Sequence, residues 1–185
     1  MPISCSYNNG EYSGNLYRGT FYECTGIEEL TYTAGNGTVF ESSENTNSSS
    51  CTKTSAQTVE YFSRGTLKKV VFAEGVTAIP KYVLCYNQAL AEVQLPSTLE
   101  MVSDYAFYSC TALETMIVPE SVKSIGTNAF TDCKVWTGSF PIWETTESIG
   151  SSAFLRCASL TGIVNIPDSF TAIESYVFEG CTVLS

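Results

Sequence analysis

The chain has 185 residues, of which 19 are acidic, 9 are basic and none is histidine, so its net charge is −10. An acidic surface repels nucleic acid and anionic membranes, and neither is therefore an expected partner. The hydrophobic fraction of 44% is ordinary for a globular protein, and the length suffices for one domain with a sizeable core. No apolar run approaches the roughly 20 residues that a membrane-spanning helix needs, and we find no signal peptide.

The N-terminal third of the chain is the least regular part. Residues 1–15 are polar and contain turn signals, so we expect them to cap the first coil of a repeat structure. Residues 16–66 are predicted to hold degenerate repeats, because apolar residues from Leu16 onward keep only part of the repeat spacing. A stretch at about residues 33–57 is rich in Ser, Thr, Asn and Gly, and we expect this insertion to loop out from the surface.

From Leu67 onward the chain repeats a unit of 23 or 24 residues. The stretch Leu90–Leu113 aligns with Leu113–Trp136, and the two following units end at Leu160 and Leu184. Self-similarity at this period with L-x-x-L-x-L spacing is typical of solenoids, in which stacked units bury a core that no single unit can form. We therefore predict a single α/β repeat domain over residues 1–185. It is a leucine-rich-repeat solenoid with five regular repeats over 67–185 and an open C-terminal end.

Each regular unit is expected to contain three pieces. A short strand such as Glu92–Leu95 comes first, a second extended piece such as Val122–Ile125 follows, and a short helical turn such as Asn128–Asp132 closes the unit. The strands of successive units are predicted to lie parallel to each other. Trp136 takes the place of a repeat leucine and is expected in the core, whereas Trp143 lies in a lengthened turn and is expected to be exposed.

Two residue types recur at fixed places and predict columns through the stacked units. The phenylalanines should stack between the strand side and the helical side, and they are Phe107, Phe130, Phe154 and Phe178. The cysteines should fill small buried sites beside turns, and they are Cys24, Cys110, Cys133, Cys157 and Cys181. We favour reduced, unreactive thiols for this column, although the distance between adjacent strands also permits disulfides.

The sequence offers no pattern for catalysis or for a cofactor. Without histidine there is no Ser-His-Asp or Cys-His arrangement, and the chain has neither a P-loop nor a G-x-G-x-x-G motif. A zinc site is not expected, since no C-x2-C pair is present. Cys5, Cys51 and Cys85 lie outside the cysteine column, and a bridge that involves Cys5 or Cys51 is the expected disulfide. We therefore expect neither an enzyme nor a cofactor.

The outward positions of the predicted strands form the candidate binding surface. Solenoid curvature turns such a row of side chains into an extended surface for a partner. The row mixes polar, charged and aliphatic side chains, which suits contact with another protein; the alternative is that these residues are merely solvated. By the repeat register, the row contains Glu29, Thr31, Lys69, Val71, Glu92, Gln94, Thr115, Ile117, Ser139 and Asn165.

The repeat resembles that of the BspA-like leucine-rich repeat family, whose unit looks like L-x-x-I-x-L-P-x-S-L-x-x-I-G-x-x-A-F-x-x-C-x-x-L. The resemblance covers about residues 67–184. It implies a surface-exposed or secreted protein that adheres to host or extracellular proteins, without catalysis. The matching residues include Leu95-Pro96-Ser97, Ser124-Ile125-Gly126, Ala129-Phe130, Ser148-Ile149-Gly150 and Ala153-Phe154.

The alternative function is structural self-assembly. The chain stops at Leu184-Ser185, one residue into the next strand, so its last coil is predicted to be uncovered. That coil would dock on the N-terminal coil of the next copy. A heterologous contact of this kind gives an open fibre unless the rotation between copies closes a ring.

Overall fold

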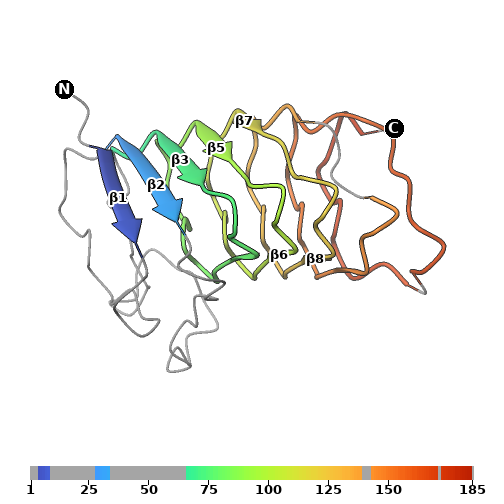
Figure 1. Cartoon of the computed structure of the whole chain (residues 1–185). Helices are drawn as coiled ribbons and strands as arrows, with labels where there is room; N and C mark the ends of the chain where they lie inside the picture. Colours follow the sequence, from blue (N-terminus) through green and yellow to red (C-terminus); the bar gives the residue numbers. More distant parts are fainter. Residues whose placement is uncertain (1–3, 9–27, 34–65, 139–142, 171, 185) are drawn as a thin grey trace, which may run out of the picture.

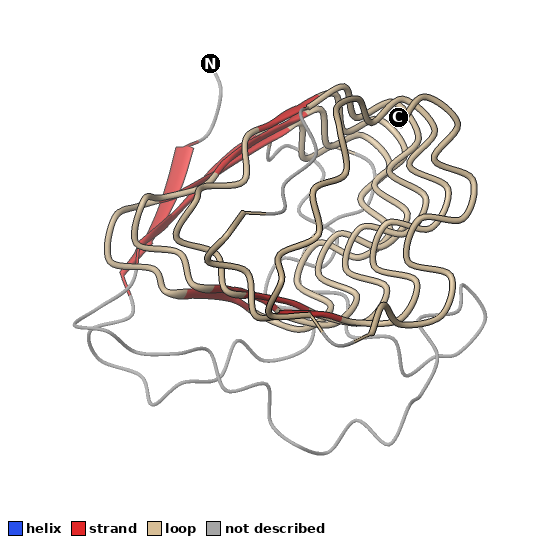
Figure 2. Ribbon diagram, turned by 90° about the vertical axis from the view of Figure 1, so that its right-hand side faces the viewer, coloured by secondary structure: helices blue, strands red, loops and turns tan. Residues whose placement is uncertain are grey.

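In the computed structural model the chain is a solenoid of parallel strands and turns, with coils stacked along one axis (Figure 1). The structure describes residues 4–8, 28–33, 66–138, 143–170 and 172–184. Viewed along the axis, each coil has strands on two sides and turns on the third (Figure 2). Within the described ranges no residue is helical. The predicted parallel-strand solenoid is confirmed.

Among the described residues, the larger sheet contains five strands in the order β1-β2-β3-β5-β7, and all of its pairs are parallel. Its register follows the repeat, because Lys69 pairs with Glu29 on one side and with Glu92 on the other. The strand predicted at Glu92–Leu95 is present. The bounds are Ser4–Asn8 for β1, Glu29–Thr33 for β2, Lys69–Phe72 for β3, Glu92–Gln94 for β5 and Thr115–Met116 for β7.

The smaller sheet is also parallel and has the order β4-β6-β8-β9. It confirms the second extended piece predicted at Val122–Ile125. Each strand is two residues long, and its second residue is buried in the core. The bounds are Ala78–Ile79 for β4, Met101–Val102 for β6, Ser124–Ile125 for β8 and Ser148–Ile149 for β9.

Two glycines after the smaller sheet allow adjacent coils to come close. A Cβ on Gly126 would lie 2.4 Å from the backbone nitrogen of Asp104, and a Cβ on Gly150 would lie 2.4 Å from that of Thr127. A backbone atom cannot move aside as the end of a flexible side chain can. These positions therefore require glycine for the approach of the neighbouring coil.

The third side of each coil, which we call the turn side, consists of successive β-turns rather than a helix. In one coil, Ala129, Thr131 and Cys133 donate their amides to carbonyls three residues earlier in the same coil. The alternate amides of Asn128, Phe130 and Asp132 instead donate to carbonyls of the next coil, at 3.0, 2.8 and 2.9 Å. Half of the amides of the turn side thus connect one coil to the next.

The short helical turns predicted from the sequence are not confirmed. Asn128 and Asp132 have φ angles of 55° and 63°, which lie in the left-handed region and exclude a right-handed helix. The same pair of left-handed positions recurs at Tyr105 and Ser109 in the preceding coil and at Ser152 and Arg156 in the following coil. The left-handed φ angles follow from the stacking of the coils. An α-helix would use these amides for its own hydrogen bonds and leave none for the next coil.

The phenylalanine column is present in the core, as predicted. The ring centroids lie 5.3 Å apart between Phe107 and Phe130, 5.5 Å between Phe130 and Phe154, and 6.1 Å between Phe154 and Phe178. Such separations suit stacked aromatic pairs. Trp136 is fully buried beside this column, as expected, and its indole Nε1–H donates to the Met116 carbonyl at 2.9 Å.

Trp143 departs from its prediction, because it is half-buried rather than exposed. A tight turn holds this residue against the coil: the Trp143 amide donates to the Thr146 hydroxyl at 3.0 Å, and the Thr146 amide donates to the Trp143 carbonyl at 2.9 Å. The Trp143 indole nitrogen is buried and has no hydrogen-bond partner among the described residues.

The cysteine column consists of free thiols that donate across the coils. Their Sγ atoms lie 3.1 to 3.3 Å from carbonyl oxygens of the preceding coil. Burial raises the pKa of the Cys110 thiol to about 12. The prediction of reduced structural thiols is confirmed for four positions, Cys110, Cys133, Cys157 and Cys181.

One place of the cysteine column is taken by a different residue, and the chain has further cysteines besides these four thiols. Asn87 takes the cysteine place in the first regular coil; it is 2% exposed, and within the described part of the chain its Oδ1 atom has no hydrogen-bond partner. Cys85 is disulfide-bonded. Cys24, Cys51 and the side chain of Cys5 lie outside the described residues, so the bridge predicted for Cys5 or Cys51 stays a prediction.

Candidate protein-binding strand face

The outward side chains of the larger sheet form one continuous surface, which we call the strand face. One row contains Glu29, Lys69, Glu92 and Thr115, which are paired in register across β2, β3, β5 and β7. A second row contains Thr31, Val71 and Gln94, and Ile117 follows β7 at the corresponding place. Asn165 is exposed in the last coil, and Ser139 lies outside the described residues.

Charged side chains on the N-terminal half of the strand face are paired with each other. Lys69 Nζ lies 3.1 Å from a Glu92 carboxylate oxygen and 4.0 Å from one of Glu29. Gln94 donates to the Glu92 carboxylate at 2.7 Å, and this bond together with Lys69 lowers the pKa of Glu92. Beside this row, Lys68 pairs with Glu28 at 3.0 Å. The two lysines are therefore already neutralised locally.

The C-terminal half of the strand face presents aliphatic side chains instead. Ile117 is 81% exposed, and Ile163 in the last coil is 73% exposed. The sequence register identified Ile117 but missed Ile163. The unit from Leu160 to Leu184 has one extra residue in its strand region, and that extra length was the available signal for a changed orientation.

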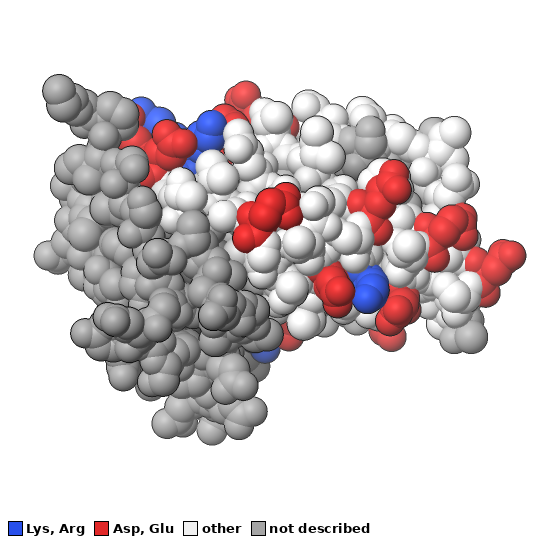
Figure 3. Space-filling model, viewed as in Figure 1, with Lys and Arg blue, Asp and Glu red and all other residues white. Residues whose placement is uncertain are grey.

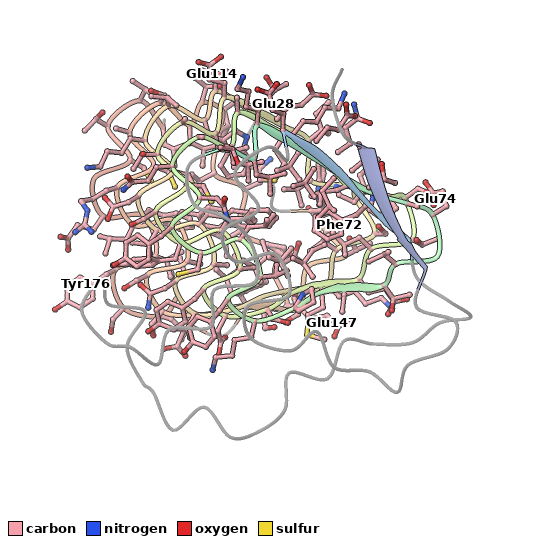
Figure 4. All side chains as sticks on the ribbon, turned by 90° about the vertical axis from the view of Figure 1, so that its left-hand side faces the viewer. Glu28, Phe72, Glu74, Glu114, Glu147 and Tyr176 are labelled. Atoms are coloured by element: carbon pink, nitrogen blue, oxygen red, sulfur yellow. The ribbon has the colours of Figure 1, made fainter. Side chains whose placement is uncertain are left out.

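Acidic side chains are spread over the described face of the solenoid that Figure 3 shows. Figure 3 shows them as separate patches on the described surface, with few basic groups among them. Figure 4 shows Glu28 and Glu114 at one end of the strand face, Glu74 at its other end and Glu147 beside the smaller sheet. In the described part of the chain, no three Asp, Glu or Cys residues lie close enough together to hold a metal ion.

The turn side contains an aromatic cluster that the sequence analysis did not identify. Tyr105 stacks on Tyr82 with ring centroids 5.1 Å apart and contacts Tyr108 at 5.6 Å. Tyr86 meets Tyr108 edge to face at 5.3 Å. Lys81 lies over the Tyr82 ring at 5.2 Å and pairs with Asp104 at 3.1 Å. These contacts join two coils and stabilise the stack.

The cysteine column does not supply a reactive thiol. Desolvation raises the pKa of Cys133 and Cys157 well above the ordinary thiol value, so these groups stay protonated at neutral pH. Arg156 is adjacent to Cys157 in the sequence, but its guanidinium bonds the Asp132 carboxylate at 2.6 and 2.8 Å. A thiol without a nearby cation and without solvent access is a poor nucleophile.

The repeat of this chain matches a known family of repeats. The model of the BspA type leucine-rich repeat region matches residues 57–185 with six copies. None of the curated proteins matches the chain. Among the described residues, no helix has the length and hydrophobicity needed to cross a membrane.

Two solved structures with TM-scores above 0.5 share this fold. A leucine-rich repeat protein from T. pallidum is 18% identical, with a TM-score of 0.54, over 98% of this chain and 62% of its own. A leucine-rich repeat protein from Bacteroides ovatus ATCC 8483 is 28% identical, with a TM-score of 0.57, over 64% of this chain and 30% of its own. A leucine rich cell surface protein from Faecalibacterium prausnitzii A2-165 is 17% identical, with a TM-score of 0.41, over 90% of this chain and 74% of its own. The chain thus spans less than two thirds of the first two proteins.

Proposed function

Because the chain belongs to the BspA-type leucine-rich repeat family, we propose that it is an adhesion-type protein-binding module that acts through its strand face. Leucine-rich repeats of this kind are scaffolds for interaction between proteins, and no enzyme family is indicated. The partner that we propose is another protein, of extracellular or host origin. We place the module at the cell surface or in a secreted protein, as the family resemblance implies.

One observation carries this proposal: the strand face combines fixed backbone positions with exposed side chains of mixed character. The parallel register holds successive outward residues at a constant spacing, so the face needs little ordering on binding. Ile117 supplies exposed apolar area beside the polar Gln94 and Thr115. Protein interfaces are commonly built from an apolar centre that a partner covers and a polar rim around it.

We expect the charged side chains of the strand face to contribute more to the specificity of binding than to its affinity. Lys69 is shared between Glu29 and Glu92, and all three side chains are solvated, so their pairing contributes little free energy. A partner that matches this alternation of charges gains selectivity and a faster encounter rate. The apolar contact at Ile117 then supplies the larger part of the affinity.

The test is a binding measurement with a matched control variant. A panel of purified extracellular matrix and cell-surface proteins is immobilised, and the binding of the 185-residue chain is recorded by surface plasmon resonance. The test variant combines Glu92→Ala, Thr115→Ala and Ile117→Ala. The control combines Glu100→Ala, Ser124→Ala and Met101→Ala on the smaller sheet, which removes similar side chains from another surface.

We expect a saturable ligand whose affinity falls at least about tenfold in the test variant, equivalent to about 1.4 kcal/mol, and is unchanged in the control. Circular dichroism establishes that both variants are folded. Equal losses in the two variants would remove the strand face as the binding surface. The absence of any saturable ligand in the panel would count against the adhesion-type function itself.

A further inference from the structure

Ion pairing on the described surface is one-sided. Every lysine and arginine side chain among the described residues lies 2.6 to 3.4 Å from a carboxylate oxygen. Several carboxylates, in contrast, form no ion pair within the described ranges, and Glu114 and Glu120 are two of them. The described surface therefore offers unpaired anions to a partner, but no unpaired cation. The paired cations are Lys68, Lys69, Lys81, Lys123, Lys134 and Arg156.

The repeat register explains why Glu114 is left without a cation. Successive amides donate to carbonyls one coil earlier, from Lys68 to Glu28, from Ala91 to Lys68 and from Glu114 to Ala91, so these four residues form one column. Lys68 pairs with Glu28 in the preceding coil. Ala91 stands between Lys68 and Glu114, which separates them by two strand spacings, about 10 Å. The Glu114 carboxylate is thus exposed at one end of the strand face (Figure 4).

Glu120 lies at the opposite end of the strand face. The hydroxyls of Thr98 and Ser121 donate at equivalent places, to carbonyls of Val76 and Leu99, so Glu120 occupies the place that Glu74 has two coils earlier. Figure 4 shows Glu74 and Glu114 at different ends of the strand face. Glu120 is exposed, and like Glu114 it has no basic side chain near it among the described residues.

An exposed aliphatic side chain lies between these two carboxylates. Ile117 is 81% exposed and is three residues from Glu114 and three from Glu120. In an extended chain this places each carboxylate about 10 Å along the backbone from the isoleucine. Residues 114–120, which we call the central segment, therefore present one apolar contact between two negative charges.

The central segment fits a basic ligand better than an acidic or a neutral one. An acidic ligand would be repelled by Glu114 and Glu120, and on the described strand face it would gain a cation only by breaking a pair such as that between Lys69 and Glu92. A neutral apolar ligand could cover Ile117, but it would leave both carboxylates without a new partner. A ligand with basic groups on each side of an apolar one pairs with all three positions.

We propose that the strand face binds a cationic segment of its partner protein, with an apolar side chain on Ile117 and lysine or arginine side chains on Glu114 and Glu120. This inference rests on the proposed function, because it assumes that the strand face is the binding surface, and it adds the chemical class of the ligand. An extended segment of pattern Lys-x-Leu-x-Lys meets the requirement. Its three side chains point to one side, and the length of the lysine side chains covers the remaining distance to the carboxylates.

The experiment uses a synthetic peptide, Ser-Lys-Ser-Leu-Ser-Lys-Ser, with acetylated and amidated ends. The peptide is titrated into the isotopically labelled 185-residue chain, and binding is followed by the chemical shifts of backbone amides. We expect saturable shifts centred on residues 114–120 and on the neighbouring strand β5. The affinity should fall when the salt concentration rises from about 0.02 M to about 0.5 M, because exposed charges are screened. The counterpart Ser-Glu-Ser-Leu-Ser-Glu-Ser should not bind.

Two variants with the same change in net charge separate a defined contact from general attraction to an acidic protein. Glu114→Gln removes one of the two proposed contacts and should weaken binding of the lysine peptide about two- to fivefold, as expected for an exposed pair. Glu147→Gln removes an equally exposed carboxylate beside the smaller sheet and should leave the affinity unchanged (Figure 4). Both substitutions affect exposed side chains, and the amide spectrum of each variant reports whether it is folded.

Three results would overturn the inference: no binding of the lysine peptide at millimolar concentration, equal binding of the glutamate peptide, or equal effects of Glu114→Gln and Glu147→Gln. Failure of the proposed function looks different, because it is the absence of a saturable ligand among the immobilised proteins. A protein ligand that requires Ile117 but tolerates Glu114→Gln and high salt would keep the function and reject the cationic ligand.

Discussion

The turn side and the strand face belong to the same coils but use opposite kinds of contact. On the turn side, rings, thiols and alternate amides of one coil meet those of the next within the buried core or in direct hydrogen bonds. On the strand face, neighbouring side chains such as Lys69 and Glu92 form ion pairs that are exposed to solvent. The difference indicates that side-chain contacts on the turn side stabilise the stack more than the side-chain contacts of the strand face do.

Removal of a ring from the column should have the largest effect. Phe130→Ala deletes a fully buried side chain that contacts Phe107, Phe154 and Trp136. We expect a loss of about 3–5 kcal/mol in the free energy of unfolding, measured by urea denaturation. Ile117→Ala on the strand face is the control and should change it by less than about 0.5 kcal/mol. Similar losses for the two variants would contradict the comparison.

The next largest loss of stability is expected from a substitution at Gly126, where the turn side begins and the neighbouring coil comes close. Gly126→Ala places a Cβ against the backbone of Asp104, and we expect a loss of about 3 kcal/mol because that backbone cannot yield. Gly75→Ala is the control: its φ is +94°, but no atom lies within 4 Å of the new Cβ. The control should lose only about 1 kcal/mol, from backbone strain alone. Thermal denaturation of both variants measures the difference.

The buried thiols predict a loss of stability at alkaline pH. Burial raises the pKa of Cys110 to about 12 and that of Cys133 well above the ordinary thiol value, whereas an unfolded thiol has a pKa of about 8.5. Between these values the unfolded chain releases protons that the folded chain keeps, so stability is complete below about pH 8.5 and falls as the pH rises toward 12. Urea midpoints at neutral pH and at about pH 10 measure the decline.

Cys133→Ala tests the assignment of this decline to the thiols. It removes one buried ionisable group, so its stability should fall less steeply with pH than that of the wild type. Labelling of the native protein by a thiol reagent should also fail at Cys110, Cys133 and Cys157 until the chain unfolds. Rapid labelling of the folded protein at these positions would show that the column is open to solvent.

The smallest change in stability is expected from substitutions on the strand face. Lys69→Met removes contacts of 3.1 Å to Glu92 and 4.0 Å to Glu29, and all three side chains are at least 31% exposed. We expect a change in the free energy of unfolding of less than about 1 kcal/mol, which decreases with added salt. A larger, salt-independent loss would mean that this surface contributes to the fold as the turn side does.

The parts of the structure that depend on the repeat period were predictable from the sequence. Because the period places equivalent residues above each other, the positions of Phe130, Cys133 and Trp136 in the core follow from alignment alone. The same register gave the outward row of Glu92 and Thr115. These predictions needed no knowledge of the backbone angles within a coil.

The parts that depend on contacts between coils were not predictable. Asn128 and Asp132 flank an Ala-Phe pair that favours a helix locally, yet both are left-handed, because their amides bond the next coil. Trp143 is held by a turn to Thr146 that the periodic pattern does not show. Ile163 became exposed because one additional residue altered the strand position of its unit.

The direction of the bonds between coils has a mechanical consequence. Strand pairs, turn-side amides and thiols all connect one coil to its neighbour, and in the described ranges these bonds join each coil to the coils before and after it. When the chain is pulled by an end, the terminal coil should therefore separate first, because it is held by one junction whereas an inner coil is held by two. The molecule should lengthen in steps of one unit, 23 or 24 residues each, and each released unit absorbs work before the next junction is loaded.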